Sequence, residues 1–398
     1  MAEAYLYDAL RTPLGEAKPT GALYEVKPVS LLAAALAALA QRQDLPLKAI
    51  EDLIVGCATP VDDQGHHIAQ AALQQSSWGN AELVNRGSAS GLEAINLAAM
   101  KVRSGWADLV VAGGLESMSR VPLGSDGGPL RYDPEVLSKA AHLPQGITAD
   151  LLATLAGFSR EALDRYALQS WQRAAQAAAN GNFSASIIPI YDRNGLLILG
   201  EDESLGQLPD PEGLAQLPPA FASVGQMGFD EIALRHFPWL ERIEHEHSLG
   251  NIGQPADGAA LMLVGSKTAG EALGLKPRAR LRAAALAPAA QSLRLDGSAP
   301  AASQALRLAG MTSEDIELWE CHEAYAAVVL HFQRELDIDD AALNVNGGAI
   351  ALGYPMGAIG AVMLVNLLDE LERRDLGTGL AAISASGGMG VATIIERV

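Results

Sequence analysis

The feature that most constrains this fold is a short apolar strand followed by an alanine-rich helix and a second apolar strand. The strands are expected at 81–85 and 107–114, with the helix at 88–104 between them. The larger apolar side chains of the helix share one face, at spacings of three and four: Leu92, Ile95, Ala99 and Val102. Its other faces are mostly alanine, so the helix should be buried nearly all round. A strand–helix–strand run of this length predicts a parallel crossover.

The same order of strand, turn, helix and strand returns after residue 277, which suggests an old duplication of one α/β unit. The first half should hold helices at 31–43 and 66–76 around a buried strand at 52–57. The second half should hold strands at 278–286 and 316–321, helices at 301–308, 324–336 and 361–374, a loop at 344–360, and a hairpin at 380–384 and 391–397.

Between these halves the chain is richer in glycine and proline, with irregular strands and one clear amphipathic helix after Ser159, its expected N-cap. This stretch predicts an insertion that covers one face of the core. We therefore expect two α/β halves, at 1–265 and 277–398, with the insertion at about 116–247 of the first.

Composition excludes several classes of protein. The net charge of −19 disfavours nucleic-acid binding, which depends on clustered Lys and Arg. The two cysteines, Cys57 and Cys321, have no CxxC neighbour, which argues against a disulfide framework or a metal site. The first residues lack the basic stretch followed by an apolar stretch that would suggest a signal peptide. No apolar run approaches the roughly 20 residues of a membrane span. The expected setting is the reducing cytoplasm, away from membranes.

Four blocks carry the chemistry. In chain order they are Val84–Gly91 (VNRGSASG), Glu320–Ala326 (ECHEAYA), Asn344–Gly357 (NVNGGAIALGYPMG) and Ser384–Gly390 (SASGGMG). In this order and spacing they resemble the thiolase family, the acetyl-CoA and 3-ketoacyl-CoA C-acyltransferases, over nearly the whole chain. The resemblance implies the five-layered αβαβα thiolase fold and a homodimer or homotetramer. It also implies an acyl-CoA or CoA ligand, as substrate rather than as a resident cofactor.

The resemblance places the family's catalytic residues on positions that hold other residue types here. In the family, a cysteine at the start of the buried helix is acylated, a histidine activates it, and a second cysteine moves a proton. By position these fall on Ser88, Tyr354 and Ser384. A serine needs a strong general base to react, and a tyrosine of ordinary pKa, about 10, stays protonated at neutral pH. Conventional thiolase turnover should therefore be absent or very weak.

His322, in the His-Glu-Ala-Tyr block, keeps one catalytic alternative open. Some thiolases, and the related ketoacyl-ACP synthases, have a histidine here. His322 could therefore act as the base of Ser88 and support esterase or acyltransferase chemistry. A third possibility is an ordinary 3-ketoacyl-CoA thiolase whose active site has been substituted. Glu323 is expected to serve packing or an N-terminal cap.

The resemblance also suggests residues near the ligand. Near the CoA pantetheine the family has Gly-Asn-x-Ser, whereas this chain has Gly253 in place of the serine and the stiffer Pro255 after it. Other family glycines are kept, and they would let the backbone crowd around a narrow tunnel. The expected substrate-binding residues are Gly253, Gly347, Gly353, Gly387 and Met389.

Each candidate also has a purely structural interpretation. For Ser88 it is a helix N-cap, which we prefer to a nucleophile because the partners are missing. Tyr354 would be a pocket-filling aromatic, Ser384 a strand-end serine satisfying a turn, and His322 a hydrogen-bonded core histidine. His245 and His247 resemble a metal pair, but an exposed, alternating strand is the preferred interpretation because no third ligand is evident. No metal is expected.

Overall fold

The computed structural model describes residues 2–74, 79–140, 142–206, 209–289, 295–385 and 387–398. Within these residues a ten-stranded sheet forms the centre of the molecule, in the order β10-β11-β12-β9-β1-β8-β5-β3-β4, with β2 pairing with β8. Its strands are β1 (Tyr5–Arg11), β2 (Gly15–Glu16), β3 (Asp52–Gly56), β4 (Ala81–Val84), β5 (Leu109–Ser117), β8 (Ala256–Gly265), β9 (Ala279–Pro288), β10 (Leu318–Cys321), β11 (Thr378–Ala385) and β12 (Met389–Arg397).

The two halves of the sheet have the same topology. In chain order, the first half runs β1, β3, β4, β5, β8, and its spatial order is β1-β8-β5-β3-β4. The second half repeats this order as β9-β12-β11-β10, with a single parallel bridge from Trp319 to Leu343 in the place of β4. Parallel and antiparallel pairings also correspond, strand by strand. This agreement supports the duplication expected from the sequence.

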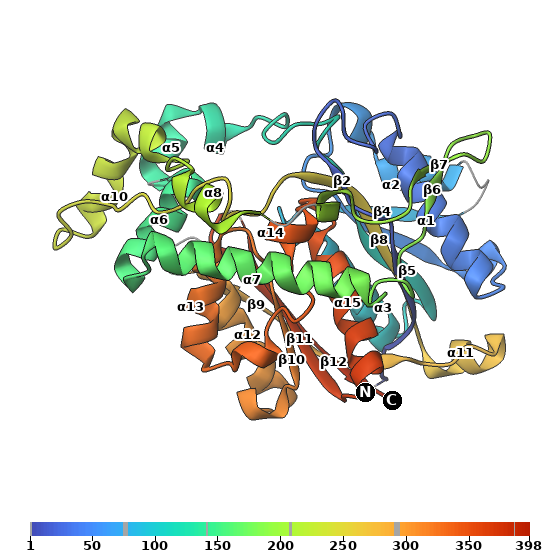
Figure 1. Cartoon of the computed structure of the whole chain (residues 1–398). Coiled ribbons are helices and arrows are strands. Elements are labelled where there is room, and N and C mark those ends of the chain that lie inside the picture. The colour runs from blue at the N-terminus through green and yellow to red at the C-terminus, as the bar shows by residue number, and fades with distance from the viewer. Residues whose placement is uncertain (1, 75–78, 141, 207–208, 290–294, 386) are drawn as a thin grey trace.

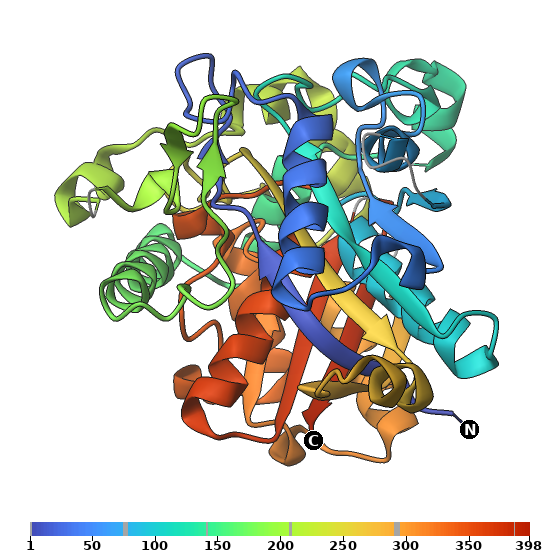
Figure 2. The ribbon, with the colours of Figure 1, turned by 90° about the vertical axis from the view of Figure 1, so that its right-hand side faces the viewer.

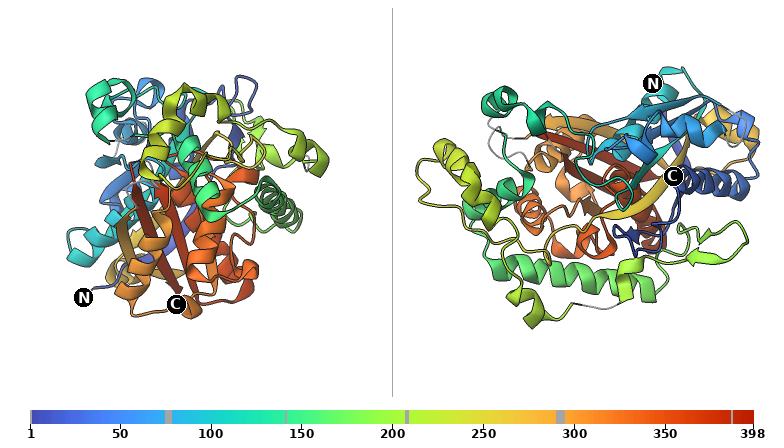
Figure 3. Two further views of the ribbon diagram at one scale, coloured as in Figure 1. Left: turned by 90° about the vertical axis from the view of Figure 1, so that its left-hand side faces the viewer. Right: turned by 90° about the horizontal axis from the view of Figure 1, so that it is seen from above.

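Helices and sheet form five layers. The helices α3 (Ser90–Ser104) and α15 (Ile359–Arg374) pack on each other and against strands of both halves, so they lie between the halves. The outer face of the first half is covered by α1 (Pro28–Arg42) and α2 (Ile68–Gln74), and α1 crosses the front of Figure 2. The outer face of the second half is covered by α12 (Ser298–Ala309) and α13 (Ala326–Leu336), seen over the red strands in Figure 3, left.

Small residues allow this close layering. Every residue of β5 and β8 is buried, as expected for strands with helices on both faces. At Gly56 a Cβ atom would lie 2.2 Å from the backbone carbon of Ser90, the first residue of α3. Only glycine therefore allows the end of β3 to lie directly against the start of α3, beside Ser88.

The chain between β5 and β8 holds the irregular insertion. Its helices α5, α6, α8 and α10 gather at one end of the molecule, and the long α7 crosses in front of the second half (Figure 1). Ser159 caps α7 by accepting a hydrogen bond from the Ala162 amide, as expected. The elements of the insertion are α4 (Pro129–Tyr132), α5 (Pro134–Ala140), α6 (Gln145–Ala156), α7 (Arg160–Ala179), β6 (Ile190–Tyr191), β7 (Leu197–Leu199), η3 (Glu203–Gly206), α8 (Pro211–Gln216), α9 (Ala222–Val224), η4 (Gly225–Phe229) and α10 (Asp230–His236).

Short elements complete the fold: η1 (Leu47–Ala49), η2 (Asp62–Gln64), α11 (Lys267–Leu273), η5 (Ser313–Asp315), η6 (Asp340–Ala342) and α14 (Ala349–Leu352). Across the described ranges, every helix is too short or too polar to cross a lipid bilayer.

Candidate functional site

Ser88 lies in a tight turn between β4 and α3. Gly87 has a φ of 55°, and the Ser90 hydroxyl accepts from the Arg86 amide while donating to the Gly87 carbonyl. The helix therefore begins at Ser90, two residues later than expected, with Ala89 as an N-cap that makes no side-chain hydrogen bond. The N-cap role that we preferred for Ser88 is wrong, because Ser90 closes the turn instead. Ser88 is buried, and its hydroxyl donates to the Ser384 carbonyl at 3.4 Å.

Tyr354 reaches Ser88 from the opposite side of the site. Its backbone is fixed by two hydrogen bonds, from its amide to the Gln254 carbonyl and from the Ala256 amide to its own carbonyl. The nearby Ser88 side chain acts to lower the pKa of the Tyr354 hydroxyl. Burial raises the pKa of Tyr354 well above its usual value and outweighs the contact with Ser88, so the phenol stays protonated.

His322 packs against Tyr354. It directly follows β10, and its amide donates to the Ala382 carbonyl. The centres of the His322 and Tyr354 rings lie 4.5 Å apart. Neither ring nitrogen of His322 has a hydrogen-bond partner among the described residues, and burial lowers its pKa to about 3. A neutral imidazole of this pKa is a weak base, and within the described residues it makes no hydrogen bond to Ser88. The Ser88–His322 pair, the alternative that the sequence left open, is therefore not formed among the described residues.

Ser384 has a structural hydrogen bond. It lies near the end of β11, buried, and its hydroxyl accepts from the amide of Ser298 at 3.0 Å. Ser298 is the first residue of α12, so Ser384 satisfies one of the free amides at that helix start. This agrees with the structural interpretation of Ser384, although the turn that it satisfies belongs to another element.

Two buried carboxylates hold the backbone around these residues. Glu116, which the sequence analysis did not single out, accepts from the amides of Ala58, Thr59 and Gly357 and from the Gln64 side chain. It thereby ties the loop after β3 to the loop that follows Tyr354. Burial raises the pKa of Glu116. Its only signal in the sequence was an acid within a long run of small and apolar residues.

Glu323 performs the same task beside His322. Its carboxylate accepts from the Tyr166 and Ser170 hydroxyls at 2.6 and 2.7 Å, and from the Ile350 amide at 3.0 Å. Ile350 lies in the first turn of α14, which fits the expected capping role. The side-chain amide of Asn344 also donates to Glu323, at 3.2 Å. Glu323 is thus fully engaged in holding α7 and α14 together.

A large pocket opens between the insertion and the core. It has a volume of about 870 Å³, and most of its wall comes from α5, α6, α10 and the loop at 123–130. The core contributes Ala58, Thr59, Met356 and Gly387. Leu130, Leu143 and Phe229 make parts of the wall apolar, while Arg235 and Asp126 add charges of opposite sign. Ser88 does not line this pocket, but Tyr354 packs against a cluster that includes two of its lining residues, Ala58 and Met356.

The five expected substrate-binding residues occupy different surroundings. Gly387 lines the large pocket. Gly347 and Gly353 border a separate cavity of about 10 Å³ beside His322, near the minimum for one water molecule. Gly253 packs on Tyr354, and Met389 contacts the Arg86 guanidinium through its sulfur at 3.9 Å. Only Gly387 therefore faces the large pocket among these five described residues.

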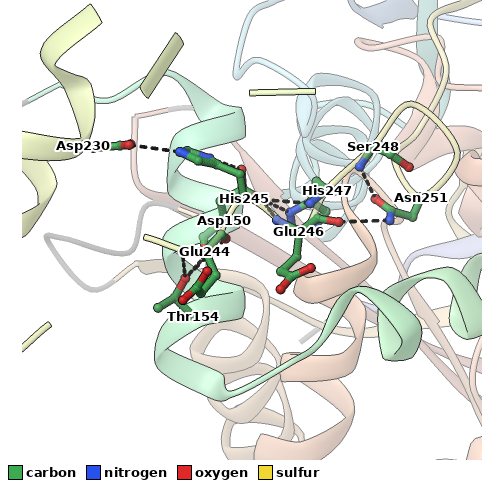
Figure 4. Close-up of polar contacts among 9 residues, drawn as sticks. All are labelled: Asp150, Thr154, Asp230, Glu244, His245, Glu246, His247, Ser248 and Asn251. Carbon is green, nitrogen blue, oxygen red and sulfur yellow. Dashed lines mark hydrogen bonds and ion pairs between the residues drawn. The ribbon is translucent and has the colours of Figure 1, made fainter. Parts of the chain in front are cut away.

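The His245–His247 segment differs from its expected form. It is neither a strand nor exposed, and His247 is completely buried (Figure 4). The reason is Asp150 of α6, whose carboxylate accepts from the His247 amide and contacts both imidazoles, at 2.8 Å for His245 and 2.7 Å for His247. The alternation of charged and histidine residues suggested exposure because the sequence does not show that a buried aspartate faces them.

No group of three or more metal-ligating side chains is placed to bind an ion within the described part of the chain. Both cysteines are free and buried. Burial raises the pKa of each thiol, with a further contribution from Glu116 at Cys57. Neither cysteine therefore replaces the missing nucleophile.

Comparisons with known proteins agree with this architecture. A family model described as "Thiolase, N-terminal domain" matches residues 4–228, and "Thiolase, C-terminal domain" matches residues 275–397. The chain is 35% identical to a 3-ketoacyl-CoA thiolase of Cronobacter sakazakii and 34% identical to one of Bacillus subtilis, in each case over the full length of both proteins. It is also similar to the crystal structure of the Bacillus anthracis acetyl-CoA acetyltransferase, with a TM-score of 0.85, 30% identity, and coverage of 100% of this chain and 99% of that one.

Proposed function

The chain belongs to the thiolase family, and from this membership we propose that it binds an acyl-coenzyme A thioester without conventional thiolase turnover. The relation to acyltransferases of fatty-acid metabolism supports the class of ligand. The hydrogen bonds of Ser88 support the loss of turnover.

The observation that carries the proposal is that no general base contacts Ser88 among the described residues. The partner of its hydroxyl is the Ser384 carbonyl, which cannot remove a proton, and the nearby phenol of Tyr354 stays protonated. A serine in this arrangement has no general base, so it stays a neutral hydroxyl at neutral pH.

The second step of thiolase chemistry also lacks a group to carry it. In the family a second cysteine moves a proton, and Ser384 stands at that position. Its hydroxyl is engaged with the Ser298 amide at the start of α12. A hydroxyl of ordinary pKa, with its oxygen already accepting a hydrogen bond, is a poor proton carrier.

The large pocket supports retention of a ligand. Its volume of about 870 Å³ lies within the usual range for small-molecule sites. An apolar wall with one guanidinium, that of Arg235, suits a ligand that combines an apolar acyl and pantetheine arm with anionic phosphates. We propose that this pocket holds the coenzyme A part of the ligand, and that Met356 and Tyr354 keep the thioester from Ser88.

The family's usual assembly and setting are part of the same proposal. We propose a homodimer or homotetramer in the cytoplasm, with acyl-CoA or CoA as the ligand. The free, buried state of both cysteines suits a reducing compartment. The acidic net charge of −19 argues against nucleic acid as a partner.

Calorimetry and intact-mass spectrometry test the proposal together. The protein is titrated with acetyl-CoA, and separately incubated with acetoacetyl-CoA and CoA before its mass is measured. We expect saturable binding of acetyl-CoA, no thiolytic cleavage of acetoacetyl-CoA and an unchanged protein mass. The arginine variant Arg235→Ala should bind more weakly, whereas Arg165→Ala, exposed on α7 outside the large pocket, should bind equally well.

The other possible outcomes separate the alternatives. A mass increase of about 42 Da, as expected for an acetylated nucleophile, that is lost in Ser88→Ala and His322→Ala would favour the acyltransferase or esterase. Thiolysis at the rate of an ordinary thiolase would show an active enzyme. Absence of any binding would overturn the proposed ligand.

A further inference from the structure

His245 joins two helices of the insertion, α6 and α10. Among the described residues, no other ionic contact connects these two helices with each other. Its Nδ1 lies 2.8 Å from the carboxylate of Asp150 on α6, and its Nε2 lies 3.0 Å from the carboxylate of Asp230 on α10. Figure 4 shows the imidazole between these two acids, with Asp230 at the start of its helix. An imidazole can donate at both nitrogens only when it is protonated. The protonated form of His245 therefore fits both acids, and the neutral form fits only one.

Helix α10 is attached to its neighbours in a way that allows it to move. It spans only seven residues and follows Gly228, which has a φ of 103° inside the preceding π-helical turn. No atom lies within 4 Å of a Cβ placed on Gly228, so this position can serve as a hinge. Besides His245, α10 is held by an apolar cluster in which Ala233 packs with Ile147 and Leu151 of α6.

Acidic side chains on both neighbouring helices face His245 and favour its protonated form. From α6 it faces Asp150, and from α10 it faces Asp230. On its own segment, Glu244 pairs with Arg242, and His247 shares the carboxylate of Asp150. Among the described residues, no Lys or Arg side chain forms an ion pair with either aspartate.

Both helices form walls of the large pocket. Gln145 and Thr148 of α6 line it on one side, and Ile232 and Arg235 of α10 on the other. We propose that His245 is a proton-dependent clasp that holds α10 against α6 and so sets the width of the large pocket. The inference goes beyond the proposed function and does not depend on it, because the clasp exists without a ligand.

The direction of the pH effect follows from the pKa of His245. Burial alone would lower this pKa, but the hydrogen bonds and charges of Asp150 and Asp230 outweigh burial and raise it above the usual value of about 6.5. A raised pKa in the folded state stabilises that state fully below about pH 6.5 and ceases to do so as the pH rises through the raised pKa. The clasp is therefore closed at about pH 6 and open at high pH.

Hydrogen exchange of the full-length protein tests the clasp without any ligand. Peptides covering 225–245 are compared between the natural protein and His245→Gln at about pH 6 and about pH 9. We expect exchange in α10 to be about two- to fivefold faster in His245→Gln at the lower pH, the effect of losing the ion pair that joins His245 to Asp230 of this helix. At the higher pH the two proteins should exchange alike.

Two further variants make the result decisive. Asp230→Asn removes one acid while leaving Asp150 with both histidines, so it should reproduce the loss of protection even if His245→Gln folds poorly. His66→Gln changes an exposed histidine remote from the clasp and should leave α10 unaffected. Equal protection of α10 in the natural protein, His245→Gln and Asp230→Asn at about pH 6 would overturn the proposal.

Discussion

At position 354 a phenol determines what the neighbouring residues can do. It lies beside Ser88, packs on His322, and through its backbone pairs with the chain at 254–256. A histidine there would offer an unprotonated nitrogen at neutral pH, whereas the buried tyrosine offers a proton. The proposed loss of turnover thus depends on this partner side chain as well as on the oxygen of Ser88.

Gly253 lies tightly against the backbone carbonyl of Glu323, beside this tyrosine. A Cβ atom at Gly253 would lie 2.8 Å from the Glu323 carbonyl and 3.5 Å from the Cβ of Tyr354. We predict that Gly253→Ser, which restores the residue usual in the family, destabilises the protein by about 1–3 kcal/mol because the backbone must shift. Chemical denaturation measures this change.

A matched glycine separates this steric effect from the effect of a new hydroxyl. At Gly200 the nearest atom to a Cβ is a Leu197 methyl at 3.6 Å, an ordinary contact. Gly200→Ser should therefore change stability by less than about 0.5 kcal/mol. Equal stability of the natural protein and Gly253→Ser would contradict the expected clash with the Glu323 carbonyl.

The sequence predicts the positions of the site residues better than their hydrogen bonds. The resemblance placed Ser88, Tyr354 and Ser384 in one site, and the structure brings them together. The helix start was misplaced because both Ser88 and Ser90 are good capping residues, and only the turn at Gly87 decides between them. Asp150 could not be assigned to the histidines because nearly a hundred residues separate them.

At the scale of single elements, two helix starts near the site are stabilised by side chains from outside the helix. Ser384 of β11 serves α12, and Glu323 serves α14. Neither pairing follows the local spacing that defines a helix cap in sequence, so sequence patterns cannot predict them. They are possible because the ends of these strands and the starts of these helices meet at one edge of the sheet.

We predict that Ser384→Ala weakens the attachment of α12. The Ser298 amide would lose its acceptor in a buried position, at a cost of about 1–2 kcal/mol. The carbonyl that accepts from Ser88 would remain. The midpoint of chemical denaturation reports the loss.

Ser30→Ala is the control for this change. Ser30 lies exposed in the first turn of α1, and no side-chain hydrogen bond is described for it. Its replacement should leave the midpoint within about 0.5 kcal/mol of the natural protein. If Ser384→Ala behaved the same way, the capping role of Ser384 would be wrong.

At the scale of the whole molecule, the duplicated α/β halves confirm the fold expected from the resemblance. The periodic spacing of hydrophobic residues and the apolar runs predicted most core helices and strands to within a few residues, because buried elements have a strong hydrophobic pattern. The insertion was predicted as a region, but the order of its short helices was not. Its apolar cluster and its polar contacts both join residues that are distant in sequence, and such contacts leave no periodic signal.

One buried ion pair connects the insertion to the core. Arg11 of β1 binds Asp202 through two hydrogen bonds, of 2.7 and 2.8 Å, and both side chains are completely buried. We predict that Asp202→Ala destabilises the whole protein by about 3–5 kcal/mol, because it leaves a buried guanidinium without its counter-charge. Thermal and chemical denaturation would both show the loss.

An exposed pair provides the comparison. Glu135 binds Lys139 on the surface of α5, with both side chains about 75% exposed. Glu135→Ala should therefore cost less than about 0.5 kcal/mol. A similar small cost for Asp202→Ala would show that Arg11 does not depend on this partner.

The steady-state rate of thiolytic cleavage of acetoacetyl-CoA tests the central claim most directly. It is measured for the natural protein and for Ser88→Cys, which restores the family's nucleophile but leaves Tyr354 in place of the base. We predict no cleavage above the uncatalysed rate in the natural protein, and little gain in Ser88→Cys, because the phenol cannot take the thiol proton. Cleavage by the natural protein at the rate of an ordinary thiolase would contradict the account.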